Sequence, residues 1–248
     1  MIELKNANQL DRMRKAGRIV AETLALMREL AKPGITTLEL DRKAEEYIRA
    51  QGAIPAFKGY NSFPATLCTS VNEQVVHGIP SLRSLDSGDI ISIDCGAVID
   101  GYFGDAAVTL PIGEVGEDLQ KLLRVTEESL MLGIGQAKLG NRLYDVSYSV
   151  QTYVEANEFS VVRDYVGHGI GRAMHEKPQI PNFGKPGRGP RLEVGMALAI
   201  EPMVNMGTYE VQTLEDHWTV VTKDSRPSAH FEHTVAITEN GPEILTRC

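Results

Sequence analysis

The chain repeats one strand pattern, and each copy ends in a carboxylate. LDSGDIISID, residues 85–94, and LEVGMALAIE, residues 192–201, share a leucine, an acid, a glycine, an apolar run, an isoleucine and a final acid. The alignment makes Asp94 the counterpart of Glu201. A repeat of this kind restricts the fold to one in which two similar units pack together.

Two further motifs recur in the same order around the repeated strand. VVHGIP (75–80) resembles VGHGIG (166–171), which pairs His77 with His168. DAAVTL (105–110) resembles EHTVAI (232–237), which pairs Asp105 with Glu232. Single apolar strands that end in an acid are common, but three motifs in one order indicate a diverged duplication.

Helical segments precede the strands in both halves. Residues 18–34 are similar to 125–140, and amphipathic segments at 36–52 and 141–158 follow them. Thr36 and Glu39 form a capping-box signature at the start of one segment. No linker separates the halves, so the 248 residues predict a single α+β domain, 1–248, with an internal repeat of about 1–112 and 113–248.

Composition excludes several classes of function. The formal net charge is -8, which disfavours nucleic acid or an anionic membrane as the main partner. No apolar run has the length of a membrane span, and the N-terminus lacks a signal-peptide core. Three widely spaced cysteines form neither a disulfide framework nor a zinc motif. We expect a cytoplasmic protein, and a monomer because the symmetry is already internal.

The repeated acids are expected to converge on one site. Asp100–Gly101 predicts a two-residue hairpin turn, which places Asp94 opposite Ala107 and Asp105 diagonally across on the same face. With Glu201 and Glu232 from the second half, four carboxylates would meet, and such a cluster cannot stay ionised and dry without a cation. Taken singly, each acid is more often structural or solvated. Together with His168 they indicate bound Mn, Fe, Co or Zn, with room for two ions.

Five motifs in order carry a family resemblance: HGIP (77–80), SIDCGAVIDGYFGD (92–105), GHGIGRAMHE (167–176), IEPMV (200–204) and FEHTV (231–235). Over essentially the whole chain they closely resemble the type I methionine aminopeptidases, of metallopeptidase family M24. The resemblance implies the pita-bread fold, a pseudo-twofold α/β sandwich with a curved antiparallel sheet. It also implies removal of the initiator methionine from nascent polypeptides when the second residue is small. Because these substrates emerge at the ribosome, transient association of the protein with ribosomes is a further expectation.

The resemblance also implies roles for individual residues. Two divalent metal ions (Co, Mn, Fe or Zn) would be held by Asp94, Asp105, His168, Glu201 and Glu232. A water between them would attack the scissile carbonyl, with Glu201 moving its proton. His175 would stabilise the oxyanion, and His77 would hold the substrate backbone.

An apolar pocket for the methionine side chain would be lined by Tyr60, Phe63, Cys68, Tyr165 and Trp218. The alternative for these five residues is ordinary core packing. Cys68 has no orienting acid nearby in the sequence, so we interpret it as a pocket wall and not as a nucleophile.

The chain departs from the family pattern without losing a ligand. The departures are Cys95, Gly96, Phe103, Ala106, Ala107 and Met174, and they put in doubt the hydrogen bonds around the ligands, the metal preference and the pocket shape. His217, His230 and His233 match no ligand position and are assigned rim or structural roles. FGKPGRGPRL (183–192) is expected to be a basic surface loop.

Three other functions compete with this interpretation. A proline-specific aminopeptidase or dipeptidase shares the fold but usually has a large N-terminal domain. A binding protein that has lost catalysis would be expected to have lost ligands. A nucleotide-binding module is disfavoured because neither GHGIG nor FGKPGRGP has a phosphate-loop pattern.

Overall fold

A computed structural model describes residues 1–247. The α-helices of this part of the chain are α1 (Ala7–Leu30), α2 (Thr37–Ala50), α3 (Glu117–Gln136) and α4 (Leu143–Ala156), and a short 3-10 helix spans Tyr60–Ser62. The strands of the main sheet are β1 (Ile54–Pro55), β2 (Leu67–Val71), β4 (Ile90–Ile99), β5 (Tyr102–Pro111), β7 (Gly167–Gly169), β8 (Glu176–Ile180), β9 (Ala197–Ile200), β14 (Glu232–Thr238) and β15 (Gly241–Ile244).

Two small sheets complete the fold. One contains β6 (Ser160–Val161), β10 (Met203–Asn205) and β13 (Ser228–His230), and the other β3 (Gln74–Val76), β11 (Val211–Thr213) and β12 (Val220–Thr222). No helix within residues 1–247 has the length and apolar character needed to cross a membrane.

The helix starts follow local capping chemistry. The predicted capping box of α2 is confirmed: the Thr36 hydroxyl accepts from the Glu39 amide, and the Glu39 carboxylate accepts from the Thr36 amide. Helix α1 begins well before residue 18, because Asn6 and Gln9 form a second capping box that the repeat comparison did not include.

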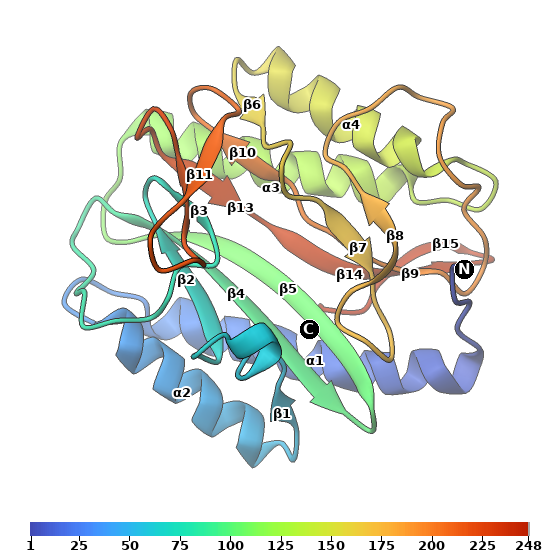
Figure 1. Ribbon diagram of the computed structural model, residues 1–248, viewed down its shortest axis with the longest axis horizontal. Helices are drawn as coiled ribbons and strands as arrows, with labels where there is room; N and C mark the ends of the chain where they lie inside the picture. Colours follow the sequence, from blue (N-terminus) through green and yellow to red (C-terminus); the bar gives the residue numbers. More distant parts are fainter. Residues whose placement is uncertain (248) are drawn as a thin grey trace.

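The main sheet is antiparallel and runs in the order β1-β4-β5-β14-β9-β7-β8. Strand β5 of the first half pairs with β14 of the second half, so the halves meet at the centre of the sheet. Figure 1 shows the curled sheet with α1 and α2 at the bottom of the view, beside the first half, and α3 and α4 at the top, beside the second. This arrangement confirms the α+β fold class, whereas the division near residue 112 stays a prediction.

The repeated turn has the same geometry in both halves. Gly88 and Gly195 have φ of 102° and 92°, in the left-handed region where glycine carries no steric penalty. Their amides donate to the carbonyls of Ile112 and Ile237 at 2.8 and 2.9 Å. The repeated glycine is therefore explained by one turn, built twice.

One predicted equivalence is wrong. His168 lies on β7, which pairs with β9. The corresponding neighbour of β4 is β2, whereas His77 follows β3, which pairs with β12 in a separate sheet. The motifs VVHGIP and VGHGIG look alike but do not occupy equivalent places in the two halves.

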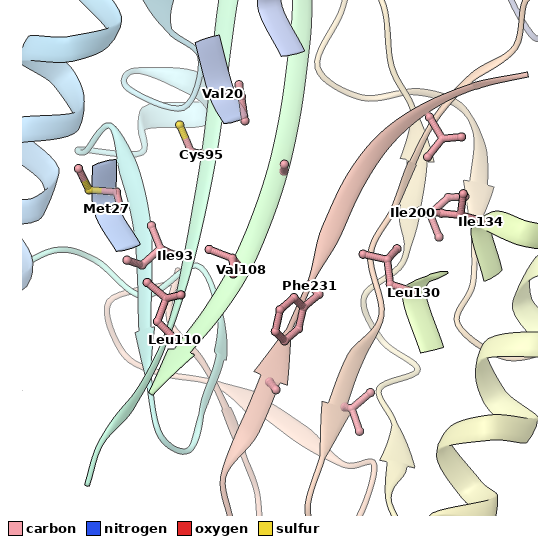
Figure 2. Close-up of a cluster of buried hydrophobic side chains, with 14 of the residues drawn as sticks. Val20, Met27, Ile93, Cys95, Val108, Leu110, Leu130, Ile134, Ile200 and Phe231 are labelled. Atoms are coloured by element: carbon pink, nitrogen blue, oxygen red, sulfur yellow. The ribbon is translucent and has the colours of Figure 1, made fainter. Parts of the chain in front are cut away.

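The opposite faces of the central strands have different roles. The Asp100–Gly101 hairpin is confirmed, with φ of 51° and 75° at its two residues. Figure 2 shows Ile93 on the side of β4 that faces Met27 of α1, and Ile200 of β9 beside Ile134 of α3. Because side chains alternate along a strand, Asp94 and Glu201 point to the face without helices.

Candidate metal centre and active site

Three adjacent strands bring acids from both halves into one row. Asp94 of β4 and Glu232 of β14 both lie opposite Ala107 of β5, so the predicted position of Asp94 is confirmed. Asp105 lies two residues along β5, diagonal to both acids on the same face. The small Ala107 side chain leaves the space between the two outer carboxylates open.

His168 adds a nitrogen to this group from β7. Its Nε2 lies 3.5 Å from Glu201 Oε1 and 3.8 Å from Asp105 Oδ2. Its Nδ1 lies 2.9 Å from the carbonyl oxygen of Gly169, where a protonated Nδ1 donates to that oxygen. The Nε2 lone pair then faces the carboxylates, which is the tautomer found in metal-binding histidines. Burial, and then the charge of His175, lower the pKa of His168 to about 4.

Burial of the acids perturbs their ionisation. It raises the pKa of Asp105 to about 7, although a hydrogen bond with Asp94 works in the opposite direction. It also raises the pKa of Asp94, Glu201 and Glu232, and the neighbouring carboxylates add to each shift. Carboxylates this close repel one another unless protons or a cation intervene.

Several polar atoms of the cluster have no partner within the described residues. Asp94 Oδ1, Asp105 Oδ1 and Glu232 Oε1 are buried without a hydrogen bond. Ligand atoms of Asp105, His168 and Glu232 all lie within 4.8 Å of one another. Unpaired oxygens and one neutral imidazole form a donor set that suits a divalent transition metal ion.

An apolar cavity of about 230 Å³ adjoins the acids. It brings together every site residue expected from the sequence: Tyr60, Phe63, Cys68, His77, Asp94, Asp105, Tyr165, His168, His175, Glu201, Trp218 and Glu232. The rings of Phe63 and Trp218 meet edge to face with centroids 5.0 Å apart. Cys68 of β2 lies opposite Asp94 of β4. Burial, and then the charge of Asp94, raise the pKa of the Cys68 thiol, so it is not an activated nucleophile.

Two further histidines, His175 and His77, line the same cavity as the acids. His175 lies at the exposed mouth, where its Nδ1 is 2.8 Å from the Tyr60 hydroxyl and its ring centroid 4.2 Å from that of His168. His77 has its ring between Tyr165 and Trp218. Its φ of 60° is uncommon for a residue other than glycine, and such conformations concentrate at functional sites.

Sequence reasoning missed a fourth histidine in the cavity wall. His230 was assigned a rim or structural role, but it is buried in the cavity, with Nε2 3.8 Å from Glu201 Oε2. Its position two residues before Glu232 could have placed it on the same face. His217 is exposed, and His233 meets Thr246 Oγ1 at 2.9 Å, away from the acids.

Four of the departures from the family pattern have packing explanations. A Cβ at Gly96 would lie 2.7 Å from Phe57 Cε1 and 3.1 Å from Met174 Cε, so glycine makes room for both side chains. Met174 and Phe103 belong to the apolar cluster that also supplies Phe63 and Cys68 to the cavity wall. Ala106 faces the core on the other side of the sheet, where a hydroxyl would have no access to the acids.

A buried acid cluster, an imidazole and an adjoining apolar cavity define a metal-dependent hydrolase. The chain belongs to metallopeptidase family M24, whose family model matches residues 11–239. It is 61% identical to the methionine aminopeptidase of Clostridium perfringens, with 99% of each chain covered. It is 59% identical to methionine aminopeptidase 1 of Bacillus subtilis, with 100% of each covered.

Solved structures confirm the pita-bread fold. The crystal structure of methionine aminopeptidase from Thermotoga maritima matches with a TM-score of 0.99 at 49% identity, over 100% of both chains. The Xaa-Pro dipeptidase from Bacillus anthracis matches with a TM-score of 0.78 at 21% identity, covering 99% of this chain and 62% of that one. The second likeness shows the shared fold alone.

Proposed function

We propose that the protein removes the initiator methionine from new polypeptides whose second residue is small. The observation that carries the proposal is the set of unpaired buried carboxylates at one end of an apolar cavity. Relatives of 59–61% identity over the whole chain bear the name methionine aminopeptidase, which supports the same activity here.

Two divalent ions (Co, Mn, Fe or Zn) fit the donor set of Asp94, Asp105, His168, Glu201 and Glu232. Four acids and one imidazole without a thiolate favour these ions over Mg. When bound, such ions polarise a carbonyl and make a water molecule acidic enough to act as a nucleophile near neutral pH.

Glu201 is the proposed general base of the reaction. It follows β9 at the edge of the cavity, with Oε1 facing His168 and Oε2 facing His230. Burial and then Asp105 raise its pKa, which brings it closer to the range in which a carboxylate takes a proton from water and returns it to a leaving amine.

His175 is the proposed donor to the carbonyl oxygen of the scissile bond. If the Tyr60 hydroxyl donates to Nδ1, Nε2 carries the ring proton and is free to donate to an oxygen that gains negative charge. The ring is exposed at the cavity mouth but partly desolvated, and this desolvation lowers its pKa and favours the neutral form. His77, which also lines the cavity, would hold the backbone beyond that bond.

The cavity supports recognition of one apolar side chain. Phe63, Cys68 and Trp218 lie in a single apolar cluster, with Tyr165 and Tyr60 at other points of the cavity wall. An unbranched thioether suits aromatic walls of this kind, because sulfur makes favourable contacts with ring edges.

The proposed partners are the N-termini of nascent polypeptides, with transient association at the ribosome where these substrates emerge. We propose a monomer in the cytoplasm, without nucleic-acid or membrane binding of its own. Cosedimentation with ribosomes and light scattering of the purified protein test these two points.

The deciding experiment compares cleavage of Met-Ala-Ser and Ala-Pro-Ser by chelator-stripped protein, with and without added Mn or Co. We expect metal-restored release of methionine and no cleavage before proline. Cleavage of Ala-Pro-Ser alone would assign the protein to the proline-specific enzymes that share its fold. Absence of cleavage with every metal would contradict a catalytic function.

A further inference from the structure

Lys5 is a buried lysine outside every motif considered so far. Its side chain is 2% exposed, and its Nζ donates to the carboxylate of Glu176, which is 12% exposed, and to the carbonyl of Glu3. The backbone amide of Lys5 donates to the Gly195 carbonyl at 2.7 Å, which fixes this segment beside the repeated turn. Lysine is rarely buried unless it is paired, so the interaction with Glu176 requires an explanation.

Glu176 closes the loop that leads into the active site. Its Oε1 accepts from the amides of Arg172 and Ala173 at 2.8 and 3.2 Å. The other oxygen accepts from Lys5. The carboxylate therefore holds the start of loop 171–175 against its end, and Lys5 supplies the opposite charge that a buried carboxylate needs.

The closed loop ends at His175, the residue directly before Glu176. Gly171 has no space for a larger side chain, because a Cβ there would lie 2.4 Å from Lys5 Cε and 2.8 Å from Glu176 Oε1. The Gly171 carbonyl accepts from the Phe103 amide at 2.9 Å, which fixes the start of the loop to β5. The His175 side chain is exposed and contacts Tyr60 and, with ring centroids 4.2 Å apart, His168. The loop backbone is therefore one of the supports that set its position.

We propose that Lys5 and Glu176 form a positioning pair that holds His175 where it can donate to the scissile carbonyl. The inference rests on the proposed function, because it assigns a purpose to His175. Lys5 does not touch substrate and acts only through the loop. A displacement of about 1 Å at a reacting group can cost about a hundredfold in rate, so a remote ion pair of this kind can affect turnover.

The test is a double-mutant cycle in the metal-loaded full-length protein. Lys5→Met keeps the apolar stem and removes the charge, His175→Ala removes the group to be positioned, and the third variant combines them. In the unmodified background, we expect Lys5→Met to lower kcat about 10- to 100-fold and to change KM less than about threefold. In the His175→Ala background, the same substitution should lower kcat less than about threefold. Equal losses in the two backgrounds, or no loss in the first, would overturn the proposal.

Controls separate positioning from general stability. Lys15→Met removes a lysine of α1 that forms an exposed ion pair with Asp100, and this variant should leave kcat unchanged. If Lys5→Met does not fold, the double variant Lys5→Met/Glu176→Gln takes its place in the cycle. The two substitutions together leave no buried carboxylate without a partner.

A second readout does not depend on activity. Lys5→Met should speed hydrogen exchange at the amides of Arg172 and Ala173 by about tenfold or more, with the amides of α3 unchanged. Unaltered exchange at these two amides would overturn the proposal. If the unmodified protein releases no methionine with any metal, the proposed function fails, and the exchange measurement alone then decides whether Lys5 holds the loop.

Discussion

Replacing Glu232 with glutamine should stabilise the metal-free protein and remove most of its response to metal. The Glu232 carboxylate is buried, and its pKa is raised by burial and then by the charges of Asp105, Glu201 and Asp94. Glutamine has nearly the same size but no charge, so the substitution removes repulsion without opening a cavity.

The magnitude follows from the distances in the cluster. Ligand atoms of Asp105 and Glu232 lie within 4.8 Å of each other. Two full charges at this distance repel by about 3.5 kcal/mol at an effective dielectric constant of roughly 20. Partial protonation reduces this value, so we expect a gain of about 1–3 kcal/mol at pH 8, or roughly 2–12 °C in the unfolding midpoint for a chain of this length.

The assay is thermal unfolding of chelator-stripped protein with and without Mn. The unmodified protein should gain about 4 kcal/mol when Mn is present at about a thousand times its Kd, and Glu232→Gln should gain much less. Glu239→Gln, at an exposed acid just after β14, is the matched control and should behave as the unmodified protein. A lower metal-free midpoint for Glu232→Gln, or an undiminished Mn response, would refute the electrostatic reasoning.

Glu201→Gln should lower kcat for methionine release by about 10²- to 10⁴-fold as the base is lost, and full activity in a peptide assay would contradict its role. Burial, and then His175, lower the pKa of His77 to about 4 from 6.5. The unfolded chain therefore binds the proton more readily, and this site should cost about 2 kcal/mol of stability as pH falls from 7.5 to 5. In urea unfolding, His77→Gln should lack this part of the pH dependence of the free energy of unfolding. The same pH dependence in the variant and the unmodified protein would contradict the assignment to His77. Gly104→Ala should destabilise by about 1–3 kcal/mol, because its Cβ would lie 2.7 Å from the Gly17 amide nitrogen. Gly135→Ala, with open space in α3, should instead stabilise by about 1 kcal/mol, and equal thermal shifts for the two variants would contradict this contrast.

Local rules made much of the acid cluster predictable from the sequence. The Asp100–Gly101 turn fixed the register of β4 and β5, because a two-residue hairpin leaves no freedom in the pairing. Alternation along the strands then placed Asp94 and Asp105 on one face. The repeat extended the same reasoning to Glu201 and Glu232, which the pairing of β5 with β14 brings to the same site.

Features that depend on tertiary contacts were not predictable. Similar letters suggested that His77 corresponds to His168, but His77 follows β3 of a small sheet, whereas His168 lies on β7 of the main sheet. Nothing near Lys5 in the sequence indicates Glu176, because the two residues meet only after the N-terminal segment packs beside the second half. His230 was detectable in principle from its spacing to Glu232, but a histidine without a matching motif gave no reason to place it in the cavity.

The two faces of the central sheet explain how the chain tolerates so many buried acids. Each strand that directs an acid toward the cavity also directs apolar side chains toward the helices, as Ile93 and Cys95 on β4 face α1 (Figure 2). Burial of these side chains contributes about 1.5–3 kcal/mol per large residue, which offsets repulsion among the acids when no ion is bound. The duplication provides this arrangement twice, on β4–β5 and on β9–β14, and the β5–β14 pairing joins the two at their acidic ends. Helices on the outer face therefore hold the acids close together before metal binds, so that binding need not also supply the free energy of folding.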